Sequence, residues 1–398
     1  MAASFSAPAS AQTYAQFRFE TALDATGYAA LLTGCSADGS LRVGNVNTKG
    51  FYPYAFYWLR GTSGEVMLYG SQAYGVSTDG SYFVGSFYAG AKRFTTAAGP
   101  WTSLGTLPNQ STSFANGVNA DGSIVVGGSG TAFRWTASTG MQSLGHLPGY
   151  PNGDSTALAV ASDGATIIGY QTATSPPYRN MAFRWTAAEG MQPLFDPETF
   201  DWSSQANAVS ADGAVIVGYA IDYSGARRAF RWKAETGPQF LQEIVLGYSG
   251  GYGVSPDGRF AFGSSKTDTN SYGLDGVIWD EQGVPHSITS LLASWGVSLP
   301  DQYLFLAVQG LSADGRTLYG EYAGREYDSW VAWLERQYPG PCPGDANNDH
   351  VVDLADLGLV LSQYGMTLPF LVGDLNLDQT VDLSDLAFVL AHFGDVCP

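Results

Sequence analysis

The feature that most constrains the fold is a ten-residue element that recurs seven times before residue 338. Each copy places Asp-Gly between two short runs of β-prone residues, as in VNADGSIVVG and VSADGAVIVG, and the flanking residues vary from copy to copy. The copies occupy residues 35–44, 76–85, 118–127, 160–169, 209–218, 254–263 and 311–320. A unit that returns at intervals of 41 to 57 residues indicates an array of similar supersecondary units.

Each repeat predicts four strands. Asp-Gly between β-prone runs is a hairpin turn, because Gly accepts positive φ and Asp bonds to nearby backbone. A second element with spaced aromatic residues follows each copy, at 55–58, 92–95, 132–135, 182–185, 229–232, 276–279 and 330–333. In the third of these, Phe133 and Trp135 share one face of a strand while Arg134 points the other way. In the middle repeats a further short strand follows, at 141–149 and 191–199.

Four strands in every repeat of this length are typical of a β-propeller blade. We therefore predict an all-β, seven-bladed β-propeller over residues 14–338. The seventh repeat ends after its third strand, whereas residues 16–23 read as a strand without a hairpin partner. We expect 16–23 to pair with 330–337 as the outer strand of the seventh blade, which closes the ring and removes a free sheet edge.

Composition restricts the environment and the partners. Asp and Glu number 36 against 18 Lys and Arg, so the formal charge is −18, which argues against nucleic acid and anionic membrane surfaces. No apolar run is long enough to span a bilayer. Residues 1–13 are rich in small residues, like the region around an export-signal cleavage site, and predict a secreted protein.

Acidic residues are concentrated at the C-terminus. Residues 342–397 hold nine Asp and no Lys or Arg, and the Pro- and Gly-rich residues 339–344 before them read as a linker to a domain at 345–398. Cys342 and Cys397 bracket this segment, which predicts a disulfide formed in an oxidising compartment. The third cysteine, Cys35, is expected to be a small buried residue in a strand.

Two parts of this segment, 345–365 and 374–394, align without gaps at an offset of 29 residues. Each offers oxygen ligands at loop positions 1, 3, 5, 7, 9 and 12, the spacing of a loop that wraps around Ca²⁺. The predicted ligands are Asp345, Asn347, Asp349, the Val351 carbonyl, Asp353 and Asp356 in the first loop, and Asp374, Asn376, Asp378, the Thr380 carbonyl, Asp382 and Asp385 in the second. The sequence therefore predicts two calcium ions.

The loops predict two further features, a left-handed residue at loop position 6 and a helix after each loop. Position 6, usually Gly, is His350 in one loop and Gln379 in the other, so both residues are expected to take a left-handed conformation. A helix is predicted after each loop from apolar residues at helical spacing. These residues are Leu354, Leu357, Val360, Leu361 and Tyr364, then Leu383, Leu386, Val389, Leu390 and Phe393.

The repeats resemble a family of extracellular bacterial proteins with HAF repeats, over roughly residues 16–338. The resemblance rests on GMxxLGxLPG, SADG and AFRW, which repeats three to five match best. Repeat two has Arg93-Phe94-Thr95 in place of Phe-Arg-Trp, and repeats six and seven keep only the final Trp. The resemblance implies an extracellular location and no particular activity.

Residues 345–394 resemble the type I dockerin, which has two loop-helix repeats and no entering helix. The resemblance implies an all-α module that binds two calcium ions and docks onto a cohesin partner. Loop positions 10 and 11, which contact the partner in that family, are Leu354, Ala355, Leu383 and Ser384 here. Because these are mostly apolar and not Ser/Thr pairs, a cohesin-like or another extracellular protein is the expected partner.

No catalytic set stands out. The repeated Asp is expected to be a turn residue. Arg134, Arg184 and Arg231 are expected to be solvated or to bridge neighbouring blades, and the alternative is that they bind anionic sugars. The four histidines, at 146, 286, 350 and 392, have no metal-ligand spacing.

We therefore expect a non-enzymatic secreted binding or scaffold protein, with the propeller as a platform for a ligand such as a glycan. The alternatives are a carbohydrate-active enzyme tethered by its dockerin and a structural cell-surface protein. Two carboxylates facing each other across the axial mouth would favour the enzyme.

Overall fold

The structure is a computed structural model of the 398-residue chain. It describes residues 10–14, 17–22, 30–46, 54–59, 66–69, 71–88, 90–96, 101–176, 178–221, 224–267, 274–294, 303–311, 317–324, 329–336, 343–347, 351–368, 371–376 and 378–396. Within these residues the fold is mostly β, with three short helices.

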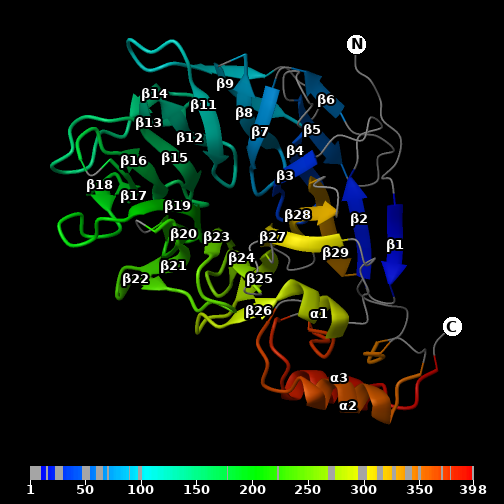
Figure 1. Ribbon diagram of the computed structural model, residues 1–398. Helices are drawn as coiled ribbons and strands as arrows, with labels where there is room; N and C mark the ends of the chain where they lie inside the picture. Colours follow the sequence, from blue (N-terminus) through cyan, green and yellow to red (C-terminus); the bar gives the residue numbers. More distant parts are fainter. Residues whose placement is uncertain are drawn as a thin grey trace.

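In the described part of the chain, twenty-nine strands form seven antiparallel sheets. Figure 1 shows how these sheets are arranged. Six sheets have four strands each: β3 (Ala30–Cys35), β4 (Leu41–Val46), β5 (Tyr54–Leu59) and β6 (Val66–Tyr69); β7 (Ser71–Val76), β8 (Tyr82–Phe87), β9 (Gly90–Thr95) and β10 (Thr102–Gly105); β11 (Phe114–Val118), β12 (Ile124–Ser129), β13 (Thr131–Thr136) and β14 (Gly140–Ser143); β15 (Ser155–Val160), β16 (Ile167–Thr172), β17 (Asn180–Thr186) and β18 (Gly190–Pro193); β19 (Ser203–Val209), β20 (Val215–Ile221), β21 (Arg227–Lys233) and β22 (Gly237–Phe240); β23 (Ser249–Val254), β24 (Ala261–Lys266), β25 (Leu274–Trp279) and β26 (Pro285–Ser287). The seventh has the order β1 (Ser10–Tyr14), β2 (Phe17–Ala22), β29 (Ser329–Arg336), β28 (Thr317–Gly324) and β27 (Tyr303–Leu311).

The strands follow the repeat as predicted. In each four-stranded sheet the strands lie in chain order, with one strand before Asp-Gly, one after it, the aromatic strand third and a short strand last. In the six Asp-Gly turns that the structure describes, the glycine has φ between 64° and 76°. A left-handed glycine at this point makes the tight hairpin that joins the first two strands.

Successive sheets contact one another around a ring, and the last sheet returns to the first through β29 and β3. Backbone hydrogen bonds join the Asp-Gly turns of neighbouring sheets. The Ala37 N–H donates to the Thr78 carbonyl at 2.9 Å, and the Ser162 N–H donates to the Ala211 carbonyl at 3.0 Å. These bonds fix each turn to the next and order one mouth of the ring.

The predicted pairing of the N-terminal strand is confirmed. β2 lies antiparallel to β29, from Phe17 opposite Arg336 to Ala22 opposite Val331. β2 therefore supplies the fourth strand that the last repeat lacks. The sheet also includes β1, which begins at Ser10, so the sheet extends into residues 1–13, the segment that we compared with an export-signal region.

Large aromatic side chains fill the space between neighbouring sheets. Phe133, Phe183 and Phe230 are fully buried, and each packs against apolar residues of the preceding sheet. Trp135 lies on the same face as Phe133, whereas Arg134 is only half-buried. The predicted division of this strand into an aromatic face and an arginine face is therefore correct, and the aromatic face makes the contact between sheets.

The pairing register corrects our alignment of two repeats. In repeat three, Gly127 lies opposite Phe133, so Arg134 follows one residue later. In repeat two the equivalent Gly85 lies opposite Lys92, which places Arg93 at the arginine position. In repeat seven Gly320 lies opposite Ala332, so Trp333 takes the arginine position as well. Our sequence alignment of both strands was wrong by one residue.

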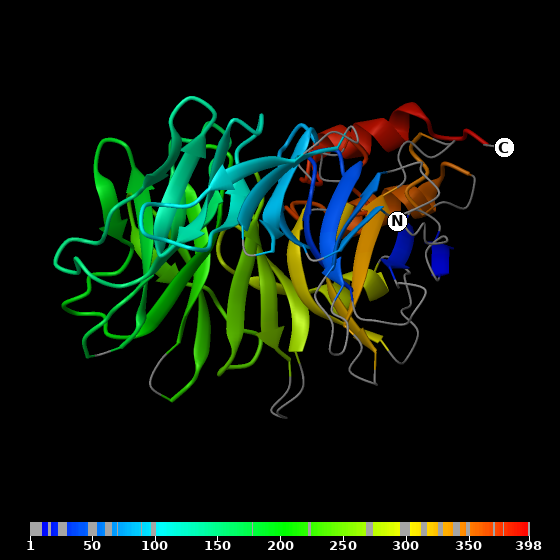
Figure 2. The same ribbon diagram turned by 90° about the horizontal axis from the view of Figure 1, so that it is seen from above.

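The C-terminal segment has two nine-residue helices, α2 (Leu354–Ser362) and α3 (Leu383–Ala391), related by the 29-residue offset. Two β-bridges follow the same symmetry, since Val351 pairs with Val396 and Thr367 pairs with Thr380. Each loop is thus paired with the residues that follow the helix of the other repeat. The buried residues of this segment form one apolar cluster with those of β24, β25, β27 and a helix absent from our prediction, α1 (Ile288–Ser294). Both views place α2 and α3 outside the ring of sheets (Figures 1 and 2).

Candidate functional site

The second loop of the C-terminal segment is built around Asp374 at position 1. This carboxylate is 2% exposed and accepts the backbone N–H groups of Asp378 at 3.1 Å and of Gln379 at 2.9 Å. Gln379 has φ 70°, so the left-handed conformation predicted at position 6 is confirmed in this loop. Asn376 and Asp378 also accept loop N–H groups, so these three side chains turn towards the inside of the loop.

The aspartates at position 12 close both loops. Asp356 and Asp385 are fully buried and accept three backbone N–H groups each, two from the start of the loop and one from position 9. Asp353 and Asp382 cap the helices α2 and α3 and complete a reciprocal capping box with these residues. The loop ends and helix starts are therefore fixed by carboxylates of the predicted ligand set.

The donor set of these loops fits Ca²⁺. Asp345, Asp356, Asp374 and Asp385 are buried in a segment that contains no Lys or Arg, and buried carboxylates require a counter-charge or strong hydrogen bonds. Within the described residues, however, no three His, Cys, Asp or Glu side chains are gathered as a bound metal requires. Asp349 and His350 of the first loop lie outside the described residues.

The apolar residues of α2 and α3 divide into two lines. Val360 and Val389 are buried, and Leu357 and Leu386 pack against them. The other predicted apolar residues are exposed at closely similar fractions in both helices: Leu354 73% and Leu383 70%, Leu361 54% and Leu390 59%, Tyr364 and Phe393 47% each. We name these six residues the paired apolar surface. It includes two of the four residues that we predicted for docking.

The ends of the C-terminal segment lie close together. A Cβ atom built on Gly344 would stand 3.1 Å from Cβ of His392, and the Val352 N–H donates to the Asp395 carbonyl at 2.9 Å. Cys342 and Cys397, which we predicted to form a disulfide, lie outside the described residues. The proximity of their neighbours agrees with such a bond, which stays a prediction.

A cavity of about 390 Å³ lies on the axis of the ring, where the Asp-Gly turns meet. Its apolar wall includes Val76, Val160, Val209, Val254 and Leu311, and the remaining lining residues are small or hydroxyl-bearing. Among the described residues the lining contains no carboxylate, so the feature that would favour an enzyme is not seen there. Cys35 also lines this cavity and is half-buried in β3, as part of the inner wall.

The repeated aspartates are turn residues wherever the structure describes them. Asp38, for example, accepts the Ser40 N–H at 3.0 Å and the Ser36 hydroxyl at 2.7 Å. Burial by itself raises the pKa of this carboxyl, but the bonds from Ser40 and Ser36 outweigh burial and lower the pKa to about 2. In repeat four Ala161 replaces the serine, and within the described residues Asp163 accepts one hydrogen bond, from the Ala165 N–H at 2.8 Å.

Unfolding measured at acid pH should test whether the hydrogen bonds of the turn aspartates stabilise the fold. Because the pKa of Asp38 is lower in the folded chain than its ordinary value of 3.8, the contribution of this carboxylate to stability should be lost as pH falls from about 4 to about 2. Since this carboxylate is exposed, we expect about 1 kcal/mol or less. Urea unfolding followed by tryptophan fluorescence should show a smaller acid-induced fall in D38N, where the amide oxygen still accepts but does not titrate. An acid-induced fall of unchanged size in D38N would contradict the assignment.

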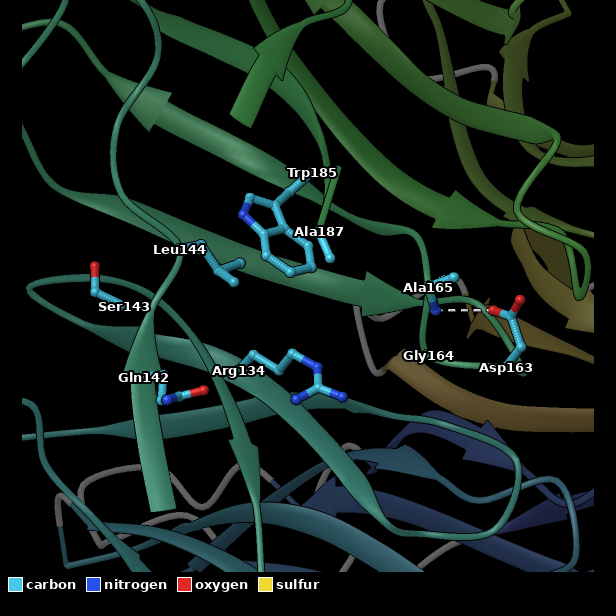
Figure 3. A pocket seen from close by; sticks show the side chains of 9 residues that line it. All are labelled: Arg134, Gln142, Ser143, Leu144, Asp163, Gly164, Ala165, Trp185 and Ala187. Atoms are coloured by element: carbon cyan, nitrogen blue, oxygen red, sulfur yellow. Dashed lines mark hydrogen bonds between the residues drawn. The ribbon is translucent and has the colours of Figure 1, made fainter. Parts of the chain in front are cut away.

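The repeated arginines mostly bridge sheets. Arg231 is buried and donates to the backbone carbonyls of Asp280 at 2.9 Å and Glu281 at 2.8 Å in the next sheet. Arg184 pairs with Glu189 at 2.6 Å and lies 5.7 Å from the ring of Trp232 in the next sheet. Arg134 instead faces a pocket of about 460 Å³ between the sheets of β13 and β17 (Figure 3). From the sequence we predicted the same role for all three arginines.

Comparison with known proteins supports the fold. No family model and no curated protein matches the chain. The β-propeller domain of the Trilobed protease from Pyrococcus furiosus, described as having an open velcro topology, aligns with TM-score 0.51 and 10% identity over 77% of this chain and 95% of that domain. A chain of the mitotic checkpoint complex aligns with TM-score 0.47 and 18% identity over 78% and 88%, and putative TolB from Agrobacterium tumefaciens with 0.38 and 12% over 61% and 95%.

The similarity to the propeller domain of the Trilobed protease supports a β-propeller fold and, at 10% identity, says nothing about activity. In this chain β2 joins the C-terminal strands β27–β29 within one sheet. No described helix has the length and apolar character needed to cross a membrane.

Proposed function

We propose that the protein is a secreted, non-enzymatic binding protein of bacterial HAF-repeat type, with a ligand-binding propeller and a dockerin-like, calcium-dependent docking module. The seven sheets are the seven blades of the propeller, and residues 345–398 are the module. Cys342 and Cys397 form the disulfide that holds its two ends together. The described neighbours of these cysteines lie close enough to support this arrangement.

The module binds two calcium ions through the two ligand sets predicted from the loops. Bound calcium supplies the positive charge that the segment itself lacks. The residues of this chain then hold the two helices in place: Asp356 and Asp385 tie each helix start to its own loop, and the bridges at Val351 and Thr380 tie each loop to the opposite repeat.

The main observation in favour of docking is the paired apolar surface. Six large apolar side chains are exposed at equivalent positions of two equivalent helices. Large apolar residues that stay exposed at repeated positions of one short segment indicate an interaction site, because burial in a complex recovers their hydrophobic free energy. The natural partner is an extracellular domain of the cohesin kind that presents an apolar patch.

Binding of purified cohesin-type domains to the full-length protein, followed by biolayer interferometry, tests the proposal. We expect binding in calcium that is lost in chelator and weakened at least tenfold in L354D/L383D, since each Asp would be buried unpaired in the complex. The matched control is L246D, because Leu246 is an equally exposed leucine (81%) on the propeller. Binding that is unchanged by chelator, or that L354D/L383D and L246D weaken equally, would contradict docking through this surface.

A further inference from the structure

The pocket in front of Arg134 breaks the symmetry of the repeats. Four consecutive sheets have an arginine at the same position of their third strand, opposite an aliphatic residue of the second strand. These arginines are Arg93, Arg134, Arg184 and Arg231. In two of the neighbouring interfaces the arginine covers the tryptophan of the next sheet. Arg93 lies 5.1 Å from the ring of Trp135, and Arg184 lies 5.7 Å from the ring of Trp232.

Arg134 makes no such contact. Within the described part of the chain its side chain has no hydrogen bond, ion pair or ring contact, and the space between Arg134 and Trp185 is the pocket of about 460 Å³. Figure 3 shows the guanidinium of Arg134 and the indole of Trp185 on opposite walls. The sequence explains the difference in part, because Thr139 stands where the next repeat has Glu189, the ion-pair partner of Arg184.

Within the described residues the side chain of Gln142, like that of Arg134, lacks the partner that its equivalents in the next two repeats have. It lies opposite Arg134 on the outer strand, as Gln192 lies opposite Arg184 and Gln239 opposite Arg231. Gln192 and Gln239 each donate their side-chain amide to a carbonyl of the adjacent turn, at 2.8 and 3.2 Å. The side-chain amide of Gln142 has no hydrogen bond among the described residues and is exposed at the pocket. Of the described interfaces of Arg134, Arg184 and Arg231, the first therefore has two neighbouring polar side chains without a partner.

These groups define the chemistry of a ligand. A guanidinium recognises a carboxylate with two parallel N–H bonds. The indole of Trp185 offers an apolar face to the C–H groups of a sugar ring. The Gln142 amide and the Asp163 carboxylate can bond to hydroxyl groups, since each lines the pocket and, within the described residues, Asp163 accepts one N–H. A volume of about 460 Å³ lies within the usual range of small-ligand pockets, roughly 300 to 1,000 Å³.

We infer that this pocket binds a carboxylated sugar unit of the uronic-acid class, stacked on Trp185 with its carboxylate on Arg134. This inference names a ligand for the propeller and rests on the proposed binding function. The net charge of −18 opposes an anionic ligand at long range, so the affinity is modest and depends on the local guanidinium.

Isothermal titration of the full-length protein with an oligogalacturonate and with its methyl-esterified form tests this inference. The two ligands share the sugar framework and differ in the carboxylate charge. We expect the acid form to bind more tightly, R134Q to weaken it by about ten- to a hundredfold, and W185L to weaken both forms. The matched control is R184Q, which changes the equivalent but already paired arginine and should leave binding unchanged.

Absence of binding, equal affinity for the esterified form, or equal losses in R134Q and R184Q would each overturn the assignment of the ligand. Recovery of the ligand from the titration separates this inference from the proposed function. Intact oligomer supports both, whereas cleavage that depends on the protein would overturn the non-enzymatic function and retain the site. Calcium and partner binding by the C-terminal module are measured independently of either result.

Discussion

Deletion of residues 1–24 should lower the free energy of unfolding by about 3–6 kcal/mol. The deletion removes β1 and β2, and with β2 the six residue pairs that join it to β29. Each backbone hydrogen bond contributes about 1 kcal/mol net, and the exposed edge of β29 adds a site for aggregation. Urea unfolding followed by tryptophan fluorescence measures the loss, and an unchanged midpoint would contradict closure of the ring by this strand.

A designed disulfide provides the control for register. Thr21 and Ala332 are paired residues, so T21C/A332C should oxidise to a disulfide in the folded chain and raise the resistance to urea. T21C/W333C is the matched variant, because a shift of one residue turns the second side chain to the other face of the sheet. Peptide mapping identifies the bond against the three native cysteines. Equal crosslinking of both variants would show that the N-terminal strand has no fixed register.

The strands of the repeat could be predicted because their signals are local. Asp-Gly sets a left-handed turn such as that at Gly122, and β-branched runs such as IVVGG follow directly. The partner of β2 followed from counting strands at the two ends of the array. The one-residue errors at Arg93 and Trp333 have a different origin, because register depends on which residues of the second strand lie opposite, here Gly85 and Gly320.

The site was harder to predict because it depends on packing between repeats. The helix α1 falls in the longest interval between Asp-Gly pairs, 57 residues, and the interval alone gave no sign of a helix. The apolar pattern of α2 did not reveal that Val360 is buried while Leu354 is exposed. One signal for the pocket was present in the sequence: Thr139 in place of Glu189 leaves Arg134 without the partner that Arg184 has.

Removal of calcium should loosen the C-terminal segment and leave the propeller intact. Nine Asp give residues 342–397 a charge of −9, and two Ca²⁺ would reduce this to −5. With free calcium at a hundred times Kd, each site stabilises the bound form by about 2.7 kcal/mol. Hydrogen exchange measured by mass spectrometry on the full-length protein should show faster exchange in α2 and α3 after addition of chelator, with no change in peptides of β12 or β16.

Single substitutions should separate the two sites. Asp356→Asn and Asp385→Asn should each remove one of two calcium ions in calorimetric titration, because position 12 closes each loop and its carboxylate is fully buried. Each substitution should also weaken the remaining site a few-fold, since the Gly394 N–H donates to Val352 of the first loop at 2.8 Å and the Gly365 N–H donates to Val381 beside the second loop at 2.8 Å. The matched control is Asp395→Asn, which removes the same charge from an exposed side chain outside both ligand sets and should leave two sites. A titration without calcium-linked heat in the parent protein, or one site lost in the control as well, would show that these loops are not calcium sites.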